Sequence, residues 1–143
     1  MGGADKGDDI RQGRKILMQP TALDRIQLTF PASDSAMLVL RMTTVGVLAQ
    51  VGLALDVVDG IKLAVDEAAR QFVTCAREKQ LSASFAQAED GLHITIGVAD
   101  GTAIAPDPEE WMVLLCVLES MVCTVNVLGA EDAPHALELI CRG

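Results

Sequence analysis

Aromatic residues are scarce in this sequence of 143 residues, where they make up 3% and Tyr is absent. Half of the residues are hydrophobic, so the core must be built from aliphatic side chains. No apolar run reaches the roughly 18 residues that a membrane-spanning helix needs. The polar start, MGGADKGDDIRQGRK, has no apolar signal-peptide core. We therefore expect a cytoplasmic protein with one domain, residues 23–143, after a disordered or tag-like lead, residues 1–22.

Basic residues are also few: 11 Lys and Arg stand against 20 Asp and Glu, and the formal net charge is −9. A negative field repels nucleic-acid phosphates and anionic membranes, so we expect neither as a partner. None of the four Cys residues forms a CxxC pair. Cys116 and Cys123 lie two helical turns apart, which excludes a disulfide or a shared metal between them. Buried free thiols in a reducing compartment fit this pattern.

The first half of the chain predicts a strand and a helix. Residues Ile26–Phe30 alternate apolar and polar side chains, the period of a half-buried strand that Pro31 ends. Ser35–Val51 has helical length, with Ser33 or Asp34 as its cap and Gly52 at its end. Its apolar side is predicted to carry Met37, Leu38, Val45 and Leu48.

A second helix is predicted from Asp56, as its cap, to about Glu78. Its core stripe, at spacings of three and four, is Val57, Ile61, Ala64, Val65, Ala68 and Phe72. The opposite face carries charges of alternating sign: Asp59, Lys62, Asp66 and Arg70. We interpret these charges as a solvated face.

The second half predicts a hairpin, a helix and two further strands. Asp90-Gly91 indicates a two-residue turn between alternating segments that run from Ser82 to Val98. Asp107, Pro108 and Glu110 form a capping box for a helix to about Thr124. That helix is apolar nearly all round, so it is either covered on both sides or has one side awaiting a partner. Strands follow at Val125–Leu128 and His135–Cys141, joined by the turn Gly129–Pro134.

This order of elements predicts an α+β fold. A mostly antiparallel sheet with helices on one face, a two-layer sandwich, covers these apolar faces most economically.

Several local motifs fall in the order of a known family. A strand ending in FPAS precedes a helix with Arg41 in VLRM, and the turn GLALDVVDGI follows. The helix IKLAVDEAARQFV carries Glu67 and Gln71 at the spacing of an N-box, and Asp100 in VADG follows a strand. From about Leu23 to its C-terminus the chain resembles the anti-sigma regulatory factors. These are bacterial serine/threonine protein kinases of the histidine-kinase-like ATPase (Bergerat-fold) superfamily.

The resemblance implies roles for five residues. Glu67 stands at the family's catalytic base, and Gln71 at the Asn that holds Mg²⁺. Asp100, followed by Gly101, stands at the Asp that reads adenine. Arg41 stands at a position that contacts the protein partner.

The sequence departs from the family where Mg-ATP would bind. Gln71 adds a methylene to the Mg²⁺ ligand, although Mg²⁺ demands near-ideal octahedral geometry. The family's long lid and Gly-rich loop are replaced by a short segment with Pro106 and Pro108, and no Gly follows Gly101 before Trp111. Proline has no N–H to offer a phosphate. We therefore expect no cofactor and a fold with a short or absent lid.

The resulting hypothesis is a degenerate regulator of the anti-sigma type. It would bind a sigma factor or an anti-anti-sigma regulator, with weak or no ATP binding. One alternative is a functional ATP-dependent serine kinase. The other is a structural module or homodimer that uses its apolar helix or a sheet edge. The partner's identity is open from sequence.

Overall fold

The computed structural model describes residues 25–122 and 124–142. The predicted lead of residues 1–22, the predicted domain start at residue 23 and Cys123 lie outside the described residues. The domain boundary therefore stays a prediction.

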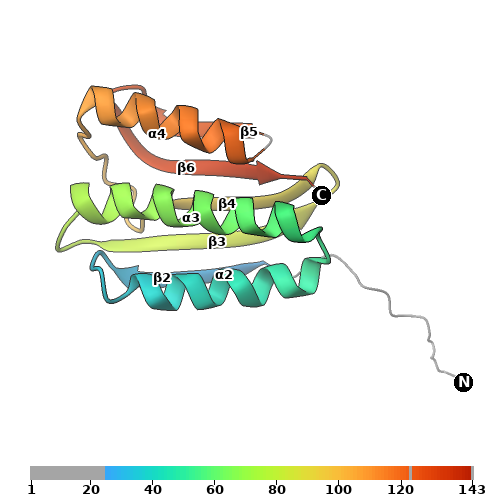
Figure 1. Ribbon diagram of the computed structural model, residues 1–143. Coiled ribbons are helices and arrows are strands. Elements are labelled where there is room, and N and C mark those ends of the chain that lie inside the picture. Colours follow the sequence, from blue (N-terminus) through green and yellow to red (C-terminus); the bar gives the residue numbers. More distant parts are fainter. Residues whose placement is uncertain (1–24, 123, 143) are drawn as a thin grey trace, which may run out of the picture.

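Five strands form one antiparallel sheet in the order β2-β3-β4-β6-β5. Their bounds are β2 Ile26–Pro31, β3 Gln80–Ala88, β4 Gly91–Val98, β5 Thr124–Ala130 and β6 Ala133–Cys141. Three helices, α2 Met37–Val51, α3 Leu55–Cys75 and α4 Pro108–Met121, lie side by side on one face of this sheet (Figure 1). The predicted α+β sandwich is confirmed, and each strand pair within residues 25–122 and 124–142 is antiparallel.

The core lies between the helices and one face of the sheet. Phe85, Ile94 and Leu139 point from the strands into this layer, where Leu40 and Phe72 meet them, and all five are fully buried. The opposite face carries a polar row at matched register: Gln27, Ser84, Thr95, Glu138 and Asn126. The alternation of the strands therefore sorts apolar from polar side chains.

The helix boundaries differ from the predicted ones. α2 begins at Met37, two residues late, because Ser33 Oγ accepts a hydrogen bond from Ala36 N and closes a separate turn first. α3 begins at Leu55 with Asp56 in its first turn, not as its cap, and it ends at Cys75 rather than near Glu78. α4 ends at Met121 rather than near Thr124. Gly52 ends α2 in the left-handed conformation, as predicted.

The β3–β4 hairpin is confirmed, but its turn lies one residue earlier than predicted. Glu89 and Asp90 form the turn, and Gly91 is already paired with Ala88. Gly91 has φ of +131°, and a Cβ there would lie 2.4 Å from the carbonyl oxygen of Cys141. Only glycine meets both conditions, so this residue fixes where β4 starts against β6.

None of the helices described here is both long and apolar enough to cross a membrane.

Candidate functional site

A groove of about 460 Å³ lies between α3 and α4. It holds two of the residues that the family resemblance singles out, Glu67 and Gln71. The side chains that complete it are Arg70, Thr74, Glu109, Glu110, Val113, Leu114 and Val117. The tertiary structure thus brings the predicted base and the predicted metal-binding residue to one surface.

Most of the charged side chains that line this groove are acidic. Gln71 Nε2 donates to Cys75 Sγ at 3.5 Å, so its amide is turned along its own helix. Three carboxylates line the groove, those of Glu67, Glu109 and Glu110. The one cation, Arg70, is already paired with Asp66 at 2.6 Å. An anionic polyphosphate would meet like charges here.

The N-terminus of α4 opens beside the same groove, and its donors are occupied. Asp107 Oδ1 accepts from the backbone N–H groups of Glu109 and Glu110, at 2.9 and 3.1 Å. Pro108, in the first turn, has no N–H. The predicted cap and the position of Pro108 are confirmed. A helix N-terminus can bind phosphate through its free N–H groups, but here a carboxylate already occupies two of them.

Asp100 and Gly101 lie outside the lining of that groove. Asp100 Oδ1 accepts from the N–H of Thr102 at 2.9 Å, and Oδ2 lies 3.6 Å from Lys79 Nζ. The hydrogen bonds from Thr102, followed by the charge of Lys79, lower the pKa of Asp100. Its side chain is 59% exposed. Asp100 is thus engaged in its own surface turn, and Gly101 supplies the left-handed residue of that turn with φ of +80°.

The segment after this turn is anchored to the sheet. Ile104 is buried, and its N–H donates to the carbonyl of Pro134 at 2.8 Å. Trp111 is also buried, with its ring edge-on to Phe72 and the ring centroids 6.2 Å apart. The contact between the rings of Trp111 and Phe72 packs α4 against α3. The short connection predicted in place of a lid is confirmed.

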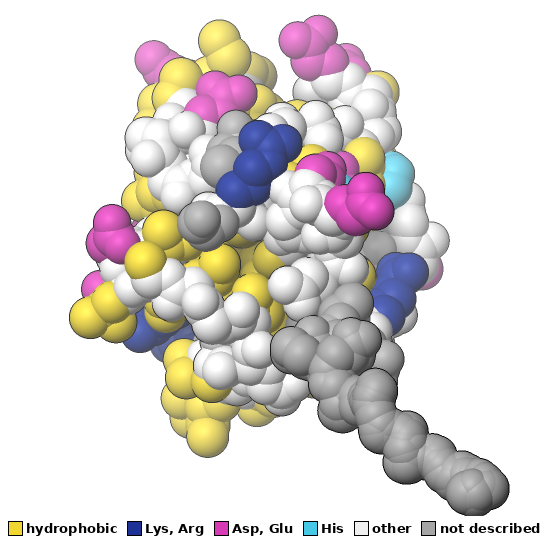
Figure 2. Space-filling view, turned by 90° about the vertical axis from the view of Figure 1, so that its right-hand side faces the viewer, with side chains coloured by type: hydrophobic (Ala, Val, Ile, Leu, Met, Phe, Trp, Pro, Cys, Tyr) yellow, Lys and Arg dark blue, Asp and Glu magenta, His cyan; other side chains and the backbone are white. Residues whose placement is uncertain are grey.

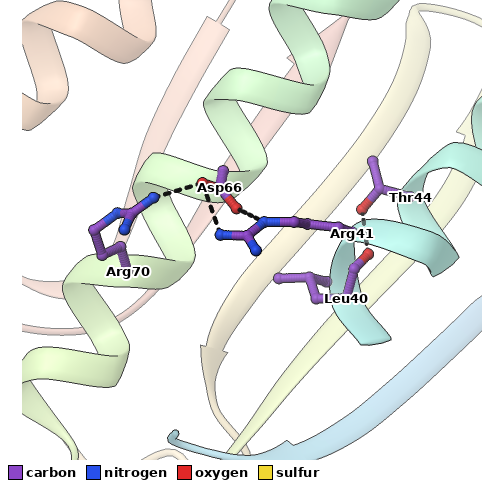
Figure 3. Close-up of polar contacts among 5 residues, drawn as sticks. All are labelled: Leu40, Arg41, Thr44, Asp66 and Arg70. Atoms are coloured by element: carbon purple, nitrogen blue, oxygen red, sulfur yellow. Dashed lines mark hydrogen bonds and ion pairs between the residues drawn. The ribbon is translucent and has the colours of Figure 1, made fainter. Parts of the chain in front are cut away.

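Arg41 takes part in a charged cluster that joins two helices. Its Nε donates to Asp66 Oδ1 at 2.6 Å and its Nη2 to Oδ2 at 3.3 Å, while Arg70 Nη2 donates to Oδ2 at 2.6 Å (Figure 3). Asp66 is only 18% exposed. The interpretation of Asp66 as part of a merely solvated face is therefore wrong, because this residue links α3 to α2.

The outward face of α2 is apolar, which corrects the predicted facing of this helix. Met37 and Leu48 are buried as expected, but Leu38 and Val45 are exposed, at 58% and 48%. Met42 between them is 67% exposed. We call Leu38, Met42 and Val45 the α2 stripe. Spacings of four and three place them on one side of the helix, and Arg41 lies at the same side.

The α2 stripe continues onto α3. A groove of about 220 Å³ lies between the two helices. The residues that line it are Arg41, Thr44, Val45, Lys62, Leu63, Val65 and Asp66. Leu63 is 55% exposed. Figure 2 shows hydrophobic side chains gathered over the helical side of the molecule. The sequence of α2 carried a signal for this surface. Its apolar residues lie on nearly every side of the helix, and one buried face does not need that many.

Comparisons with known proteins bear on the fold. No protein-family description matches the chain, and no curated protein matches it. A crystal structure of the RsbU and RsbW domains of Rv1364c from Mycobacterium tuberculosis matches 84% of this chain, with a TM-score of 0.64 and 17% identity. The match spans 32% of that longer chain. The chain therefore shares a fold with part of that structure, in agreement with the fold expected from the sequence.

Proposed function

We propose that this chain is a non-catalytic regulator of the anti-sigma type, which acts in bacterial transcriptional control by binding a protein partner. The observation that carries the proposal is the α2 stripe with Arg41 beside it. Large contiguous apolar patches on the surface of a protein often mark sites that bind another molecule. The partner class, a sigma factor or an anti-anti-sigma regulator in the cytoplasm, comes from the family resemblance and from the likeness in fold.

The groove beside Glu67 supports the second part of the proposal, that ATP binds weakly or not at all. Its carboxylates oppose phosphate, and the N–H groups at the start of α4 are occupied by Asp107. Asp100, the residue proposed to read adenine, is engaged with Thr102 and Lys79. Gln71 would be a poor Mg²⁺ ligand for the reason of geometry given above. We therefore place binding, rather than phosphoryl transfer, at the centre of the function.

Nucleotide binding is tested by isothermal titration of Mg-ATP and Mg-ADP into the purified protein, with Asp100→Ala as the control. We expect no heat of binding at millimolar nucleotide. Micromolar binding that Asp100→Ala abolishes would instead establish the kinase alternative, with Glu67 as base. Phosphorylation of a partner serine would then be the next assay.

Partner binding is tested with purified sigma factors and anti-anti-sigma regulators encoded in the same genome. We expect one of them to bind, and Met42→Asp to weaken that binding about tenfold or more. Val113→Asp is the control, because Val113 is also exposed, at 58% against 67% for Met42, and lies on α4 outside the α2–α3 groove. Binding by none of these proteins would refute the proposal. A dimer in light scattering that Met42→Asp disrupts would assign the stripe to self-association instead.

A further inference from the structure

A third groove, of about 540 Å³, lies between α4 and β5, on the side of α4 away from the groove beside Glu67. Its apolar lining comes from Pro106, Pro108, Trp111, Met112 and Leu115, and from Val127 of β5. It shares none of its lining with the groove beside Glu67 or with the α2 stripe. The proposed function therefore makes no use of it.

The strand beside this groove is an edge strand. β5 is last in the sheet order, so only its β6 side is paired within the described part of the chain. Its sequence, TVNVLGA, contains no charged residue and no Pro. Proteins commonly protect an exposed edge with Lys, Pro or a bulge, because unpaired N–H and C=O groups invite another strand. β5 has only a bulge, at Leu128/Gly129, so the stretch before it is open to pairing.

The register of β5 relates this edge to the groove. Val125 and Val127 pair with Leu139 and Leu137, two fully buried residues of the helix-facing side of the sheet. A strand added to β5 would lie about 4.8 Å beyond it and would alternate its side chains in the same way. Every second side chain of that strand would therefore point toward α4. The space it would enter is the apolar groove that Met112 and Leu115 border.

Charge selects among the segments that could add here. The charged side chains that line the groove are both acidic, Glu131 and Asp132, and both are exposed in the turn between β5 and β6. The net charge of the sequence, −9, adds a long-range field of the same sign. An extended segment with a cationic residue at this end would be attracted, and an acidic one repelled.

We propose that the β5 edge and this groove bind an extended segment of a partner protein. The segment adds antiparallel or parallel to β5 as a sixth strand. It places alternate apolar side chains against Trp111, Met112 and Leu115, and a Lys or Arg beside Glu131 and Asp132. Main-chain pairing supplies affinity, and the groove and the two carboxylates supply specificity.

The test uses the full chain and synthetic peptides of seven residues, the length of β5. One set alternates Val or Leu with Thr and ends in two Lys residues, and the matched set ends in two Glu residues. The fluorescence of Trp111, the single Trp of the sequence, reports occupancy because its side chain lines the groove. Hydrogen–deuterium exchange of the β5 amides reports strand addition.

We expect the Lys-ended peptides to change the fluorescence and to slow exchange in β5. The double variant Glu131→Lys/Asp132→Lys should weaken their binding about tenfold. The control Glu89→Lys/Glu119→Lys, which reverses two exposed carboxylates outside the groove, should leave binding within about twofold. Because both variants reverse exposed charges, circular dichroism should find both folded.

Four results would overturn the proposal. The Glu-ended peptides could bind as well as the Lys-ended ones, or neither set could bind. Binding could also occur without protection of β5. Protection of β5 that rises with protein concentration alone, with a dimer in light scattering, would show that a second copy of this chain occupies the edge. None of these outcomes would affect the test of Met42→Asp, so this inference and the proposed function can fail separately.

Discussion

Asp66 of α3 accepts a hydrogen bond from Arg41 of α2, with 2.6 Å between Asp66 Oδ1 and Arg41 Nε. This hydrogen bond, followed by the charge of Asp66, raises the pKa of Arg41 above its already high ordinary value, so the guanidinium stays charged. Arg41 is still 50% exposed. A side chain that is held in place and yet accessible loses little conformational freedom when a partner binds it.

The first prediction separates the two arginines that share Asp66. Arg41→Ala should weaken partner binding about tenfold or more, because Arg41 lies beside the α2 stripe. Arg70→Ala removes the other ion pair of Asp66 but lies outside the lining of the α2–α3 groove, so binding should stay within about twofold. Isothermal titration with the partner measures both. Equal losses for the two variants would show that Arg41 acts only through the charged cluster.

The second prediction concerns Gly97 in β4. A Cβ there would lie 2.4 Å from the carbonyl oxygen of His135 and 2.5 Å from Cβ of Ala136. Because backbone cannot yield cheaply, Gly97→Ala should lower the free energy of unfolding by about 2–3 kcal/mol. Gly46 is the matched control, since it lies exposed in α2 with no atom within 4 Å of an added Cβ. Gly46→Ala should raise stability by about 0.5–1 kcal/mol. Urea unfolding distinguishes the two signs.

The third prediction is a pH dependence on the open face of the sheet. His93 Nε2 lies 2.6 Å from Asp90 Oδ1, and Nδ1 lies 3.4 Å from Glu138 Oε2. The hydrogen bond to Asp90 is the main cause that raises the pKa of His93 above 6.5. A raised pKa in the folded state means that the folded state binds the proton more tightly. The stabilisation is therefore fully present below about pH 6.5 and is lost as the pH rises through the raised value.

His93→Gln should accordingly cost about 0.5 kcal/mol more at about pH 5.5 than at about pH 9. Asp90→Asn should remove most of the same pH dependence, because Asp90 raises the pKa of His93 more than Glu138 does. Chemical denaturation at both pH values checks this. A cost that is independent of pH, or larger at high pH, contradicts the assignment.

The fourth prediction concerns the start of α4. Asp107→Ala removes the acceptor for the N–H groups of Glu109 and Glu110 and should cost about 1 kcal/mol. Asp107→Asn keeps a capping oxygen and should cost only about 0.3 kcal/mol. Thermal unfolding followed by circular dichroism compares the two. Equal costs would show that the carboxylate charge, rather than the cap, stabilises the helix.

Local signals predicted much of the fold because they depend on neighbours in the chain. The sequence predicted the alternation of the β3–β4 hairpin, the cap at Asp107 and the end of α2 at Gly52. The core stripe on α3 was also predicted from the sequence: Val57, its first member, is partly exposed and its other five members are buried. The turn was predicted one residue too late. The position of Gly91 depends on its close approach to the carbonyl of Cys141, which is distant in sequence.

The candidate site depended on contacts between distant segments. Spacing placed Glu67 and Gln71 on one helix, but no local pattern shows that α4 brings Glu109 and Glu110 against them. The N-box likeness likewise did not show that Asp100 would bind Thr102 and Lys79 in a turn of its own. Asp66 looked solvated because its partner Arg41 lies 25 residues away in sequence.

The sequence by itself determined the type and order of the strands and helices, because capping, turns and hydrophobic period act within a few residues. The tertiary structure alone decided which side of α2 is buried and what lies beside each site. α2 is apolar on nearly every side, so its own residues do not choose a face. Its packing against α3 makes that choice, and it leaves Leu38, Met42 and Val45 at the surface beside Arg41.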